Sequence, residues 1–376
     1  MVFLDNASTT KVLDVVAKEM QTYFCDTFYN PGALYSPAFF VHKKVEECRG
    51  ALCKFLGASE GTVIFTGSAT EANNMVLRCV KKRKQGKIVV SCGEHASIYE
   101  TAKQLELQGE NVVWVPLQEN GCVNMQALES VLDESVDIVS VIHVSNETGA
   151  INPLREISAL VRKKAPNALL HSDGVQAFGK IDVDIDELDV DFYTISAHKI
   201  HGPKGIGALY VKNVKNIKHP LIFGGGQEMG LRSGTTNVPL IMGFVKAAEE
   251  KFAHKQEHFQ KVKALKQAMA EGLAQICNVC FNGNIEKDSP YILSVSLLHV
   301  RGEVLLHALE AEQIYVGTGS ACSSKTIENR VLRNMGKNQV EIEGNIRISF
   351  NGYDEVDVPY VVEKIAKLQK KLAKTR

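Results

Sequence analysis

Short apolar runs alternate with helical patterns of hydrophobic positions between about residues 60 and 215 of the chain. The runs predict strands at Thr62–Phe65, Ile88–Ser91, Val112–Val115, Ile138–Val144, Ala168–His171, Phe192–Ile195 and Gly207–Val211. Because these runs are rich in β-branched residues and nearly continuous, they are typical of strands buried on both faces of a sheet. The alternation of strands and helices therefore predicts an α/β fold with a mostly parallel seven-stranded sheet covered by helices.

Two of the intervening helices have clear apolar faces. The first is expected from Thr70 to about Gln85, with a basic run, Lys81–Lys84, as its solvated last turn. The second begins at Asn152-Pro153, a capping residue followed by proline at the first helical position.

The pattern changes after about residue 237, where a long helical stretch runs to about Ile276. Strand-like segments follow at Ile292–Leu298, Ile314–Val316 and Ile346–Ser349, and a last helix starts near Val356. This order predicts a smaller α+β domain. We expect residues 13–250 to form the large domain, and residues 1–12 with 251–376 to form the small one.

The composition excludes several classes of protein. The 376 residues contain 43 Lys plus Arg and 43 Asp plus Glu, so the net charge is zero, and a nucleic-acid or acidic-membrane partner is not expected. The start of the chain, MVFLDNASTT, lacks the apolar core of a signal peptide, and no apolar run is long enough for a membrane helix.

The nine cysteines are an odd number scattered along the chain, which is not a disulfide framework and fits a reducing cytoplasm. Cys277 and Cys280 form an isolated CxxC, and no second pair of ligands at similar spacing accompanies it, so no metal site is expected.

The segment ISAHKIHGPKGIGALYV (195–211) offers the first candidate chemistry. Lys199 follows a predicted strand, and a lysine that forms a Schiff base needs such a place beside donors for an anionic cofactor. Ser196 and His198 could supply phosphate contacts. A surface lysine in a turn is an equal alternative for this segment taken alone.

Three upstream segments favour the cofactor interpretation. In FTGSATEANN (65–74), Ala69 and Thr70 lie at the start of a helix, whose free N–H groups suit a phosphate. In HSDGVQ (171–176), Asp173 follows a strand and could pair with a pyridinium nitrogen, while Gln176 could reach the ring hydroxyl. In GEH (93–95), His95 could stack on the ring and transfer protons.

Each of these features has a purely structural alternative: a capped helix, an aspartate in a turn, or a structural histidine. All four segments, however, follow predicted strands, and ligands bind at the carboxyl edge of a parallel sheet. Together they predict a pyridoxal-phosphate site.

With these segments the chain resembles the cysteine desulfurases, the NifS/IscS-like group of fold-type I, class V pyridoxal-phosphate enzymes. The resemblance covers nearly the whole length, in the motifs LDNASTT (4–10), YNPGA (29–33), FTGSATEANN, GEH, HVSNETGAI (143–151), HSDGVQ, SAHKIHGPKG, GGGQEMGLRSGT (224–235), GSACSS (319–324) and RISF (347–350). The phosphate turn reads TGSATE where TSGATE is usual, which keeps the residues small.

The resemblance implies a role for each residue of the site. Lys199 holds the cofactor, His95 stacks on its ring, Asp173 and Gln176 contact its nitrogen and hydroxyl, and Ala69, Thr70, Ser196 and His198 bind its phosphate. Thr235 completes the phosphate site of a partner subunit, which implies a homodimer. Asn146 lies beside the cofactor hydroxyl and the substrate, and Arg347, assisted by Asn30, binds the substrate carboxylate.

The implied reaction removes sulfur from L-cysteine and leaves L-alanine. Cys322, in a run of small residues, would receive the sulfur as a persulfide and pass it to an acceptor protein. The alternative is that Cys322 is an ordinary buried cysteine without a catalytic role. Housekeeping members carry a longer tail that docks an iron–sulfur scaffold, whereas this chain ends at Arg376. A tRNA- or thiamine-thiolation enzyme is therefore an equal alternative as acceptor.

Four other functions compete with desulfuration. A selenocysteine lyase or a cysteine sulfinate desulfinase depends less on a loop cysteine, so Cys322→Ala would separate these enzymes from a desulfurase. A class V aminotransferase would release no sulfide. A non-catalytic subunit that binds the cofactor for stability has no physical need to keep Lys199, His95, Asp173 and Cys322 together.

Overall fold

The computed structural model describes residues 1–319 and 329–373. Its main element is a seven-stranded sheet in the order β2, β8, β7, β6, β5, β3, β4. In that order the strands are Thr62–Thr66, Gly207–Val211, Phe192–Ser196, Leu169–Asp173, Val136–Ser140, Lys87–Ser91 and Asn111–Val115. Strand β8 alone runs opposite to the other six strands, which are parallel to one another. The predicted α/β fold with a mostly parallel sheet is confirmed.

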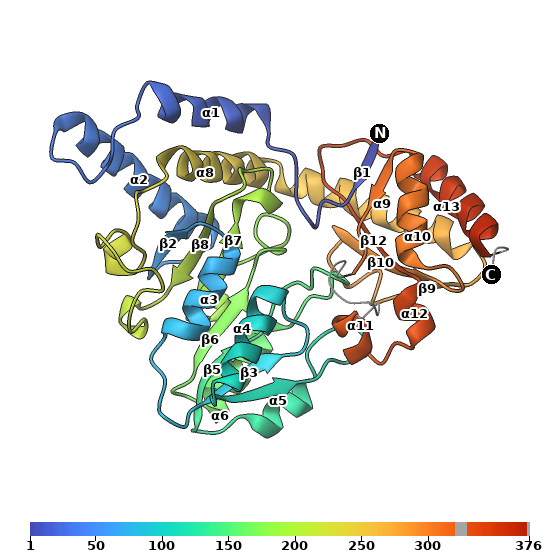
Figure 1. Ribbon diagram of the computed structural model, residues 1–376, viewed down its shortest axis with the longest axis horizontal. Coiled ribbons are helices and arrows are strands. Elements are labelled where there is room, and N and C mark those ends of the chain that lie inside the picture. The colour runs from blue at the N-terminus through green and yellow to red at the C-terminus, as the bar shows by residue number, and fades with distance from the viewer. Residues whose placement is uncertain (320–328, 374–376) are drawn as a thin grey trace.

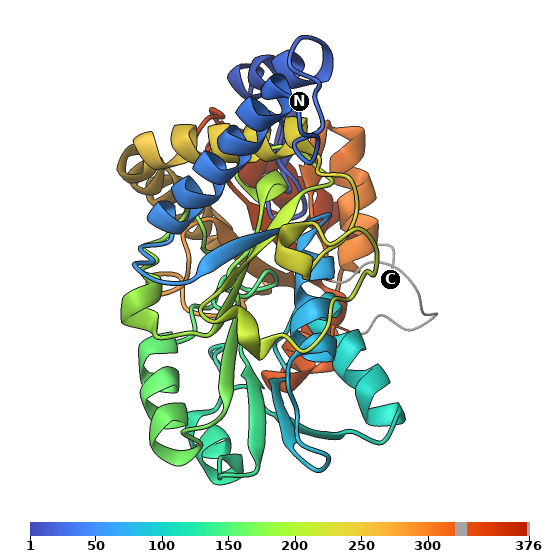
Figure 2. The same cartoon turned by 90° about the vertical axis from the view of Figure 1, so that its left-hand side faces the viewer.

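Helices cover both faces of this sheet (Figures 1 and 2). One face packs against α1, α2, α5, α6, α7 and α8, which are Asp14–Cys25, Ser36–Phe55, Met125–Val131, Leu154–Lys164, Ile185–Leu188 and Val238–Ala253. The other face packs against α3, Ala69–Cys79, and α4, Ala96–Leu107. Because successive residues of a strand point to opposite faces, Val63 and Phe65 pack on the first of these faces and Ile64 packs on the other.

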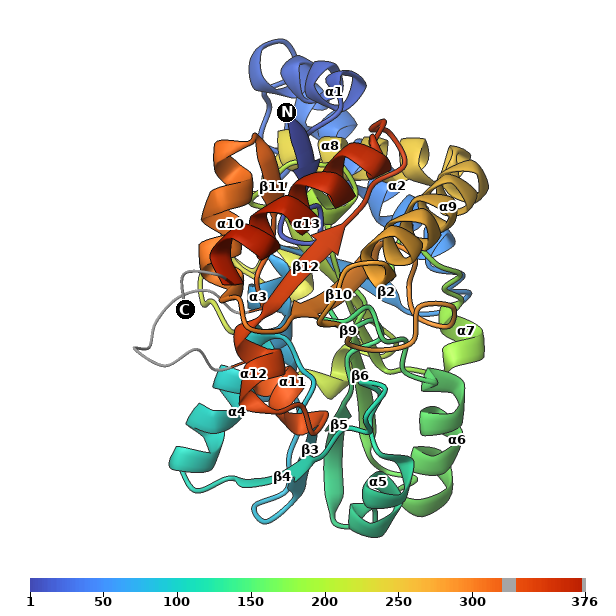
Figure 3. The ribbon, with the colours of Figure 1, turned by 90° about the vertical axis from the view of Figure 1, so that its right-hand side faces the viewer.

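A second core lies within the carboxyl-terminal part of the chain. Figure 3 shows the strands and helices that surround it. It gathers the parallel pair β1 (Val2–Leu4) and β11 (Ile314–Val316), and the antiparallel sheet β12 (Asn345–Ser349), β10 (Ile292–Leu297) and β9 (Val279–Phe281). The helices α9, α10 and α13, which are Lys255–Ala274, Gly302–Ala311 and Val358–Ala373, complete it. We propose on this separation of cores that the chain divides into domains between α8 and α9.

Two short helices bridge from the small part to the large sheet: α11 (Arg330–Asn334) and α12 (Gln339–Glu343). Their apolar side chains, Val331, Leu332 and Ile342 among them, pack against Leu117. No helix among the described residues is both long and apolar enough to cross a membrane.

Several predicted boundaries were wrong. Helix α3 ends at Cys79 because Val80 turns to extended backbone and pairs with Ile217, so Lys81–Lys84 belongs to a connection and is not a last helical turn. The predicted strand to Val144 stops at Ser140, and Val144 instead bridges to Ile151.

One prediction about a helix start was also wrong. Asn152 does not cap α6, because its side chain is buried and bonded to Val123 N and Ile142 O, and Pro153 takes the capping position. The predicted long helical stretch is confirmed, and it consists of two consecutive helices, α8 and α9, with a break at His254.

Candidate active site

A cavity of about 380 Å³ opens where the carboxyl ends of the parallel strands meet the small part of the molecule. Most of the predicted site residues line it: Ala69, Thr70, His95, Asn146, Asp173, Gln176, Ser196, His198, Lys199 and Arg347. The start of α3, the start of α4, the end of β6 and the turn after β7 each bring part of this set. The convergence of strand ends was thus predicted correctly, whereas the roles of the residues stay predictions.

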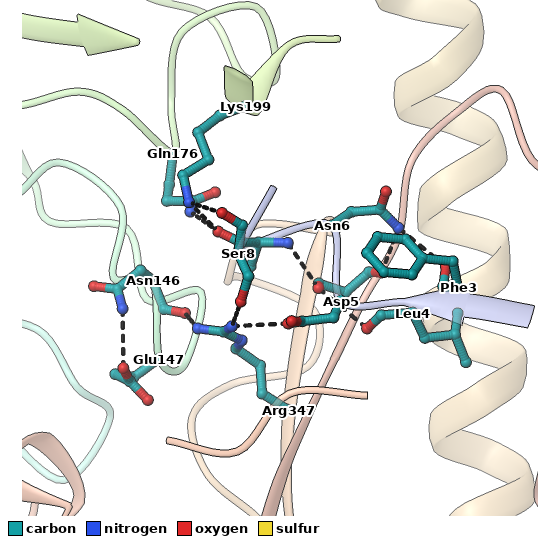
Figure 4. Close-up of polar contacts among 12 residues, drawn as sticks. Phe3, Leu4, Asp5, Asn6, Ser8, Asn146, Glu147, Gln176, Lys199 and Arg347 are labelled. Atoms are coloured by element: carbon teal, nitrogen blue, oxygen red, sulfur yellow. Dashed lines mark hydrogen bonds and ion pairs between the residues drawn. The ribbon is translucent and has the colours of Figure 1, made fainter. Parts of the chain in front are cut away.

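Lys199 lies in a single 3₁₀ turn, Ala197–Lys199, directly after β7. Its Nζ donates to the carbonyl oxygens of Ala7 and Ser8, both at 2.6 Å (Figure 4). Burial, reinforced by the nearby charge of Arg347, lowers the pKa of this amine to about 8. At pH 7 about one tenth of this amine is therefore neutral and nucleophilic, and the neutral fraction grows as the pH rises toward 8.

Asp173 is buried at the end of β6. One of its oxygens accepts the side-chain N–H of Asn73 at 2.8 Å, and the other accepts the backbone N–H of Val175 at 3.0 Å. These donors fix the orientation of the carboxyl group, which would pair with a cationic ring nitrogen.

His95 is oriented by Ser97, which also connects it to Asn73. The Nδ1 of His95 accepts the backbone N–H of Ser97 at 3.2 Å, and it lies 2.9 Å from the Ser97 hydroxyl. That hydroxyl in turn accepts from Asn73 Nδ2 at 2.8 Å. Burial lowers the pKa of His95, so the ring is neutral with its proton on Nε2.

Arg347 comes from β12 and is held by the N-terminal segment (Figure 4). Its guanidinium donates to Asp5 Oδ1 at 2.9 Å, to Ser8 Oγ at 2.7 Å and to the carbonyl of Asn146 at 2.8 Å. These contacts hold a planar cation at the rim of the cavity, as recognition of a substrate carboxylate requires.

Three predicted residues are not among those that line this cavity. Asn30 is exposed between α1 and α2, where its Oδ1 accepts from Gly32 N at 2.9 Å. Thr235 lines a separate hollow of about 120 Å³ with Gly67 and Arg232. Cys322 lies outside the described residues.

Several residues of the site were not predicted from the sequence. Asp5, Ala7 and Ser8 lie in the LDNASTT motif, and Asn73 lies in FTGSATEANN, but the sequence assigned none of them a contact. Their partners are far away along the chain: Asp5 binds Arg347, and Asn73 binds Asp173. The two motifs that contain these residues were the signal from which they could have been predicted as part of the site.

The residues present fit pyridoxal phosphate. A Cβ on Gly207 would lie 2.6 Å from the carbonyl carbon of Ser68 and 2.7 Å from Ala69 N, so only glycine lets β8 lie against the turn that opens α3. This turn offers the free N–H groups of a helix start to an anion. Asp173 and Lys199 supply the carboxylate and the amine that a pyridine aldehyde needs.

Comparisons with known proteins bear on the identity of the chain. The model of the family described as aminotransferase class-V matches residues 2–358. The chain belongs to this family. Its resemblance to the NifS/IscS-like members is confirmed by relatives of nearly the same length.

Cysteine desulfurase IscS 1 of Archaeoglobus fulgidus is 35% identical over 377 residues, covering 97% of this chain and 98% of the relative. The mitochondrial cysteine desulfurase of Saccharomyces cerevisiae is also 35% identical, over 97% of this chain and 74% of its own. A solved NifS-like protein shares 35% identity with a TM-score of 0.92, covering 99% of this chain and 100% of its own. SspA, solved in complex with cysteine, shares 28% identity with a TM-score of 0.80 over 94% of this chain and 100% of its own.

Proposed function

We propose that this protein is a pyridoxal-phosphate-dependent cysteine desulfurase, which converts L-cysteine to L-alanine and hands on the sulfur. The observation that carries the proposal is that Lys199, Asp173 and Arg347 face one cavity at the carboxyl edge of the sheet. Relatives that are named cysteine desulfurases and match nearly all of this chain support the same reaction.

Each residue of the cavity would have a defined task. Arg347 would bind the substrate carboxylate and orient the α-carbon toward Lys199. Lys199, whose pKa is lowered to about 8, would take the proton from that carbon in its neutral form. Pyridoxal phosphate, when bound, supplies the electron sink that makes this proton acidic. Asp173 would keep the ring nitrogen protonated, and His95 would exchange protons through Nε2.

The phosphate would be held by the start of α3 and by the turn after β7. Ala69 and Thr70 offer backbone N–H groups there, and Ser196 and His198 line the same cavity. Burial, with the cations Lys199 and Lys204 nearby, lowers the pKa of His198 to about 4, so its ring would act as a neutral hydrogen-bond partner.

A homodimer is part of the proposal. Thr235 lies away from the cavity of its own chain, as expected of a residue that serves the partner's phosphate. The connection of α1 to α2 and the segment that precedes α8 lie on one side of the molecule (Figure 1). Large apolar side chains are exposed in and around these two segments: Phe24, Phe28, Leu34, Tyr35, Phe39, Phe40, Ile222, Phe223 and Met229. A second copy of the chain would cover them.

Cys322 is the proposed acceptor of the substrate sulfur. Its thiolate would attack that sulfur, the Cβ–S bond of the substrate would break, and the electron pair of that bond would pass to the carbon that becomes the methyl group of L-alanine. An iron–sulfur scaffold and a tRNA- or thiamine-thiolation enzyme stay open as the protein that receives the persulfide. The cytoplasmic location expected from the cysteine pattern stays a prediction.

The test is the formation of alanine and sulfide from L-cysteine and a thiol reductant by the purified holoenzyme. We expect the two products in equal amounts from the wild-type protein and from Cys277→Ala, which removes an exposed cysteine unrelated to the proposal. Cys322→Ala should bind the cofactor but release neither product. Release of both products by Cys322→Ala at the wild-type rate would refute Cys322 as the acceptor of the sulfur. A bound cofactor without any alanine from the wild-type protein would refute the desulfurase, and selenocysteine and cysteine sulfinate would then be assayed as substrates.

A further inference from the structure

Lys180 is a buried lysine close to the proposed cofactor site that the mechanism above does not use. It follows Asp173 by seven positions, and only 4% of its surface is exposed. None of the ion pairs found among the described residues includes it. Its Nζ instead donates to Oε1 of Gln176 at 2.7 Å.

This contact decides which end of the Gln176 amide faces the cavity. Because Oε1 accepts from Lys180, the NH₂ group is directed to the other side, where Nε2 donates to the carbonyl of Ala7 at 2.9 Å. The same carbonyl accepts Nζ of Lys199 at 2.6 Å (Figure 4). The second hydrogen of Nε2 remains available on the cavity side, where Gln176 is a lining residue.

Within residues 1–319 and 329–373, Lys180 has no other strong partner. Its Nζ lies 5.7 Å from the ring centre of Tyr291, whose hydroxyl is 3.4 Å from Nζ of a second buried lysine, Lys251. Burial, together with the nearby cations Lys199, Lys251 and Arg347, holds the pKa of Lys180 well below its usual range. A neutral amine still donates a hydrogen bond, so the contact with Gln176 does not depend on charge.

We propose that Lys180 is a positioning residue of the cofactor site, which holds the Gln176 amide so that its NH₂ group donates to the ring oxygen of the cofactor. The proposal rests on the proposed function in one respect, namely that a pyridoxal cofactor occupies the cavity. Without Lys180 the amide could turn over and present its oxygen, which repels an electron-rich ring oxygen.

The measurement is the pH midpoint of the visible absorption change of the bound cofactor. A donor to the ring oxygen favours the deprotonated, more negative form of the cofactor and so lowers this midpoint. Lys180→Met removes the contact and keeps most of the aliphatic volume. We expect it to raise the midpoint by about half to one pH unit, the contribution of one ordinary hydrogen bond.

Two further variants separate positioning from other effects. Lys251→Met removes the neighbouring buried amine, which contacts Tyr291 and not Gln176, and should leave the midpoint close to that of the wild type. Gln176→Leu removes the donor itself, so it should raise the midpoint as Lys180→Met does. Adding Lys180→Met to Gln176→Leu should then change nothing more.

The proposal is overturned if Lys180→Met leaves the midpoint unchanged, or if it shifts the midpoint equally in the Gln176→Leu background, because Lys180 would then act through its own charge. An unchanged midpoint in Gln176→Leu overturns it too, even where Lys180→Met does not fold. A wild-type protein that shows no cofactor absorption would instead contradict the proposed function.

Discussion

Glu94 is a buried acid beside the proposed catalytic histidine, and its protonation gives a sharp test of the electrostatics of the site. Only 1% of its surface is exposed. Oε1 accepts from Ser91 Oγ at 2.6 Å and from Ile142 N at 2.7 Å, whereas Oε2 has no hydrogen-bond partner among the described residues. Burial, assisted by the negative charge of Asp173, raises the pKa of Glu94 to about 8.

The raised pKa makes folding pH-dependent. Below about pH 4.5 the folded and unfolded chains both carry the proton, so the ionisation of Glu94 does not lower the stability. As the pH rises, the unfolded chain releases the proton while the folded chain keeps it, so stability falls by about 1.4 kcal/mol per pH unit until the folded acid ionises near pH 8. Between pH 5 and pH 8 the loss is on the order of 4 kcal/mol.

Glu94→Gln removes this dependence and keeps the shape of the side chain. Its amide oxygen can accept from Ser91 and Ile142 as Oε1 does, while its NH₂ group takes the place of Oε2 and lacks an acceptor, which costs about 1–3 kcal/mol at every pH. We expect the variant to unfold more easily than the wild type at pH 5. At pH 8 it should be the more stable of the two.

The assay has two parts, both on the cofactor-free protein. Thermal unfolding midpoints from pH 5 to pH 9 test whether the wild type and Glu94→Gln exchange their order of stability. Glu119→Gln is the control, because it removes an exposed carboxylate. Infrared absorption of a protonated carboxyl at neutral pH, present in the wild type and absent in Glu94→Gln, tests the proton directly. A stability difference that stays constant with pH, together with no such absorption, would refute the reasoning.

Three other substitutions test the contacts of the site and its support. Arg347→Lys loses the planar fork held by three contacts, so KM for L-cysteine should rise at least about tenfold while the cofactor absorption stays; an unchanged KM would place the carboxylate elsewhere. Arg49→Met leaves Glu228 buried without its 2.7 Å ion pair, and should lower the free energy of unfolding by about 3–5 kcal/mol in denaturant titrations. Asn73→Ala removes the donor to Asp173 and should lower the free energy of unfolding by about 1–3 kcal/mol. It should also weaken the retention of cofactor in dialysis. Retention equal to that of the wild type would show that Asp173 is held by its backbone contact alone.

The positions of the strands were predictable because a strand buried on both faces carries its own signal in the sequence. Gly207–Val211 was predicted with the bounds that the structure has. Lys199 was predictable as a site residue for a related reason: polar residues directly after such strands meet at one edge of a parallel sheet.

Element ends and side-chain partners were much harder to predict. Helix α3 keeps a helical pattern past Cys79, and it ends there only because Val80 pairs with Ile217, a residue remote in sequence. The helical stretch after Val238 breaks at His254, because α8 packs into the core of the large sheet and α9 into the second core. No local propensity carries such information.

The sequence by itself determined the α/β architecture, the strand ends that bear the candidate chemistry, and the family. Only the tertiary structure decided how these side chains are held: Arg347 by Asp5 from the opposite end of the chain, Asp173 by Asn73, and Gln176 by Lys180. The physical reason is that hydrophobic periodicity is a local property of the chain. A buried polar group, by contrast, takes its charge and its orientation from whichever donors and acceptors the fold brings to it.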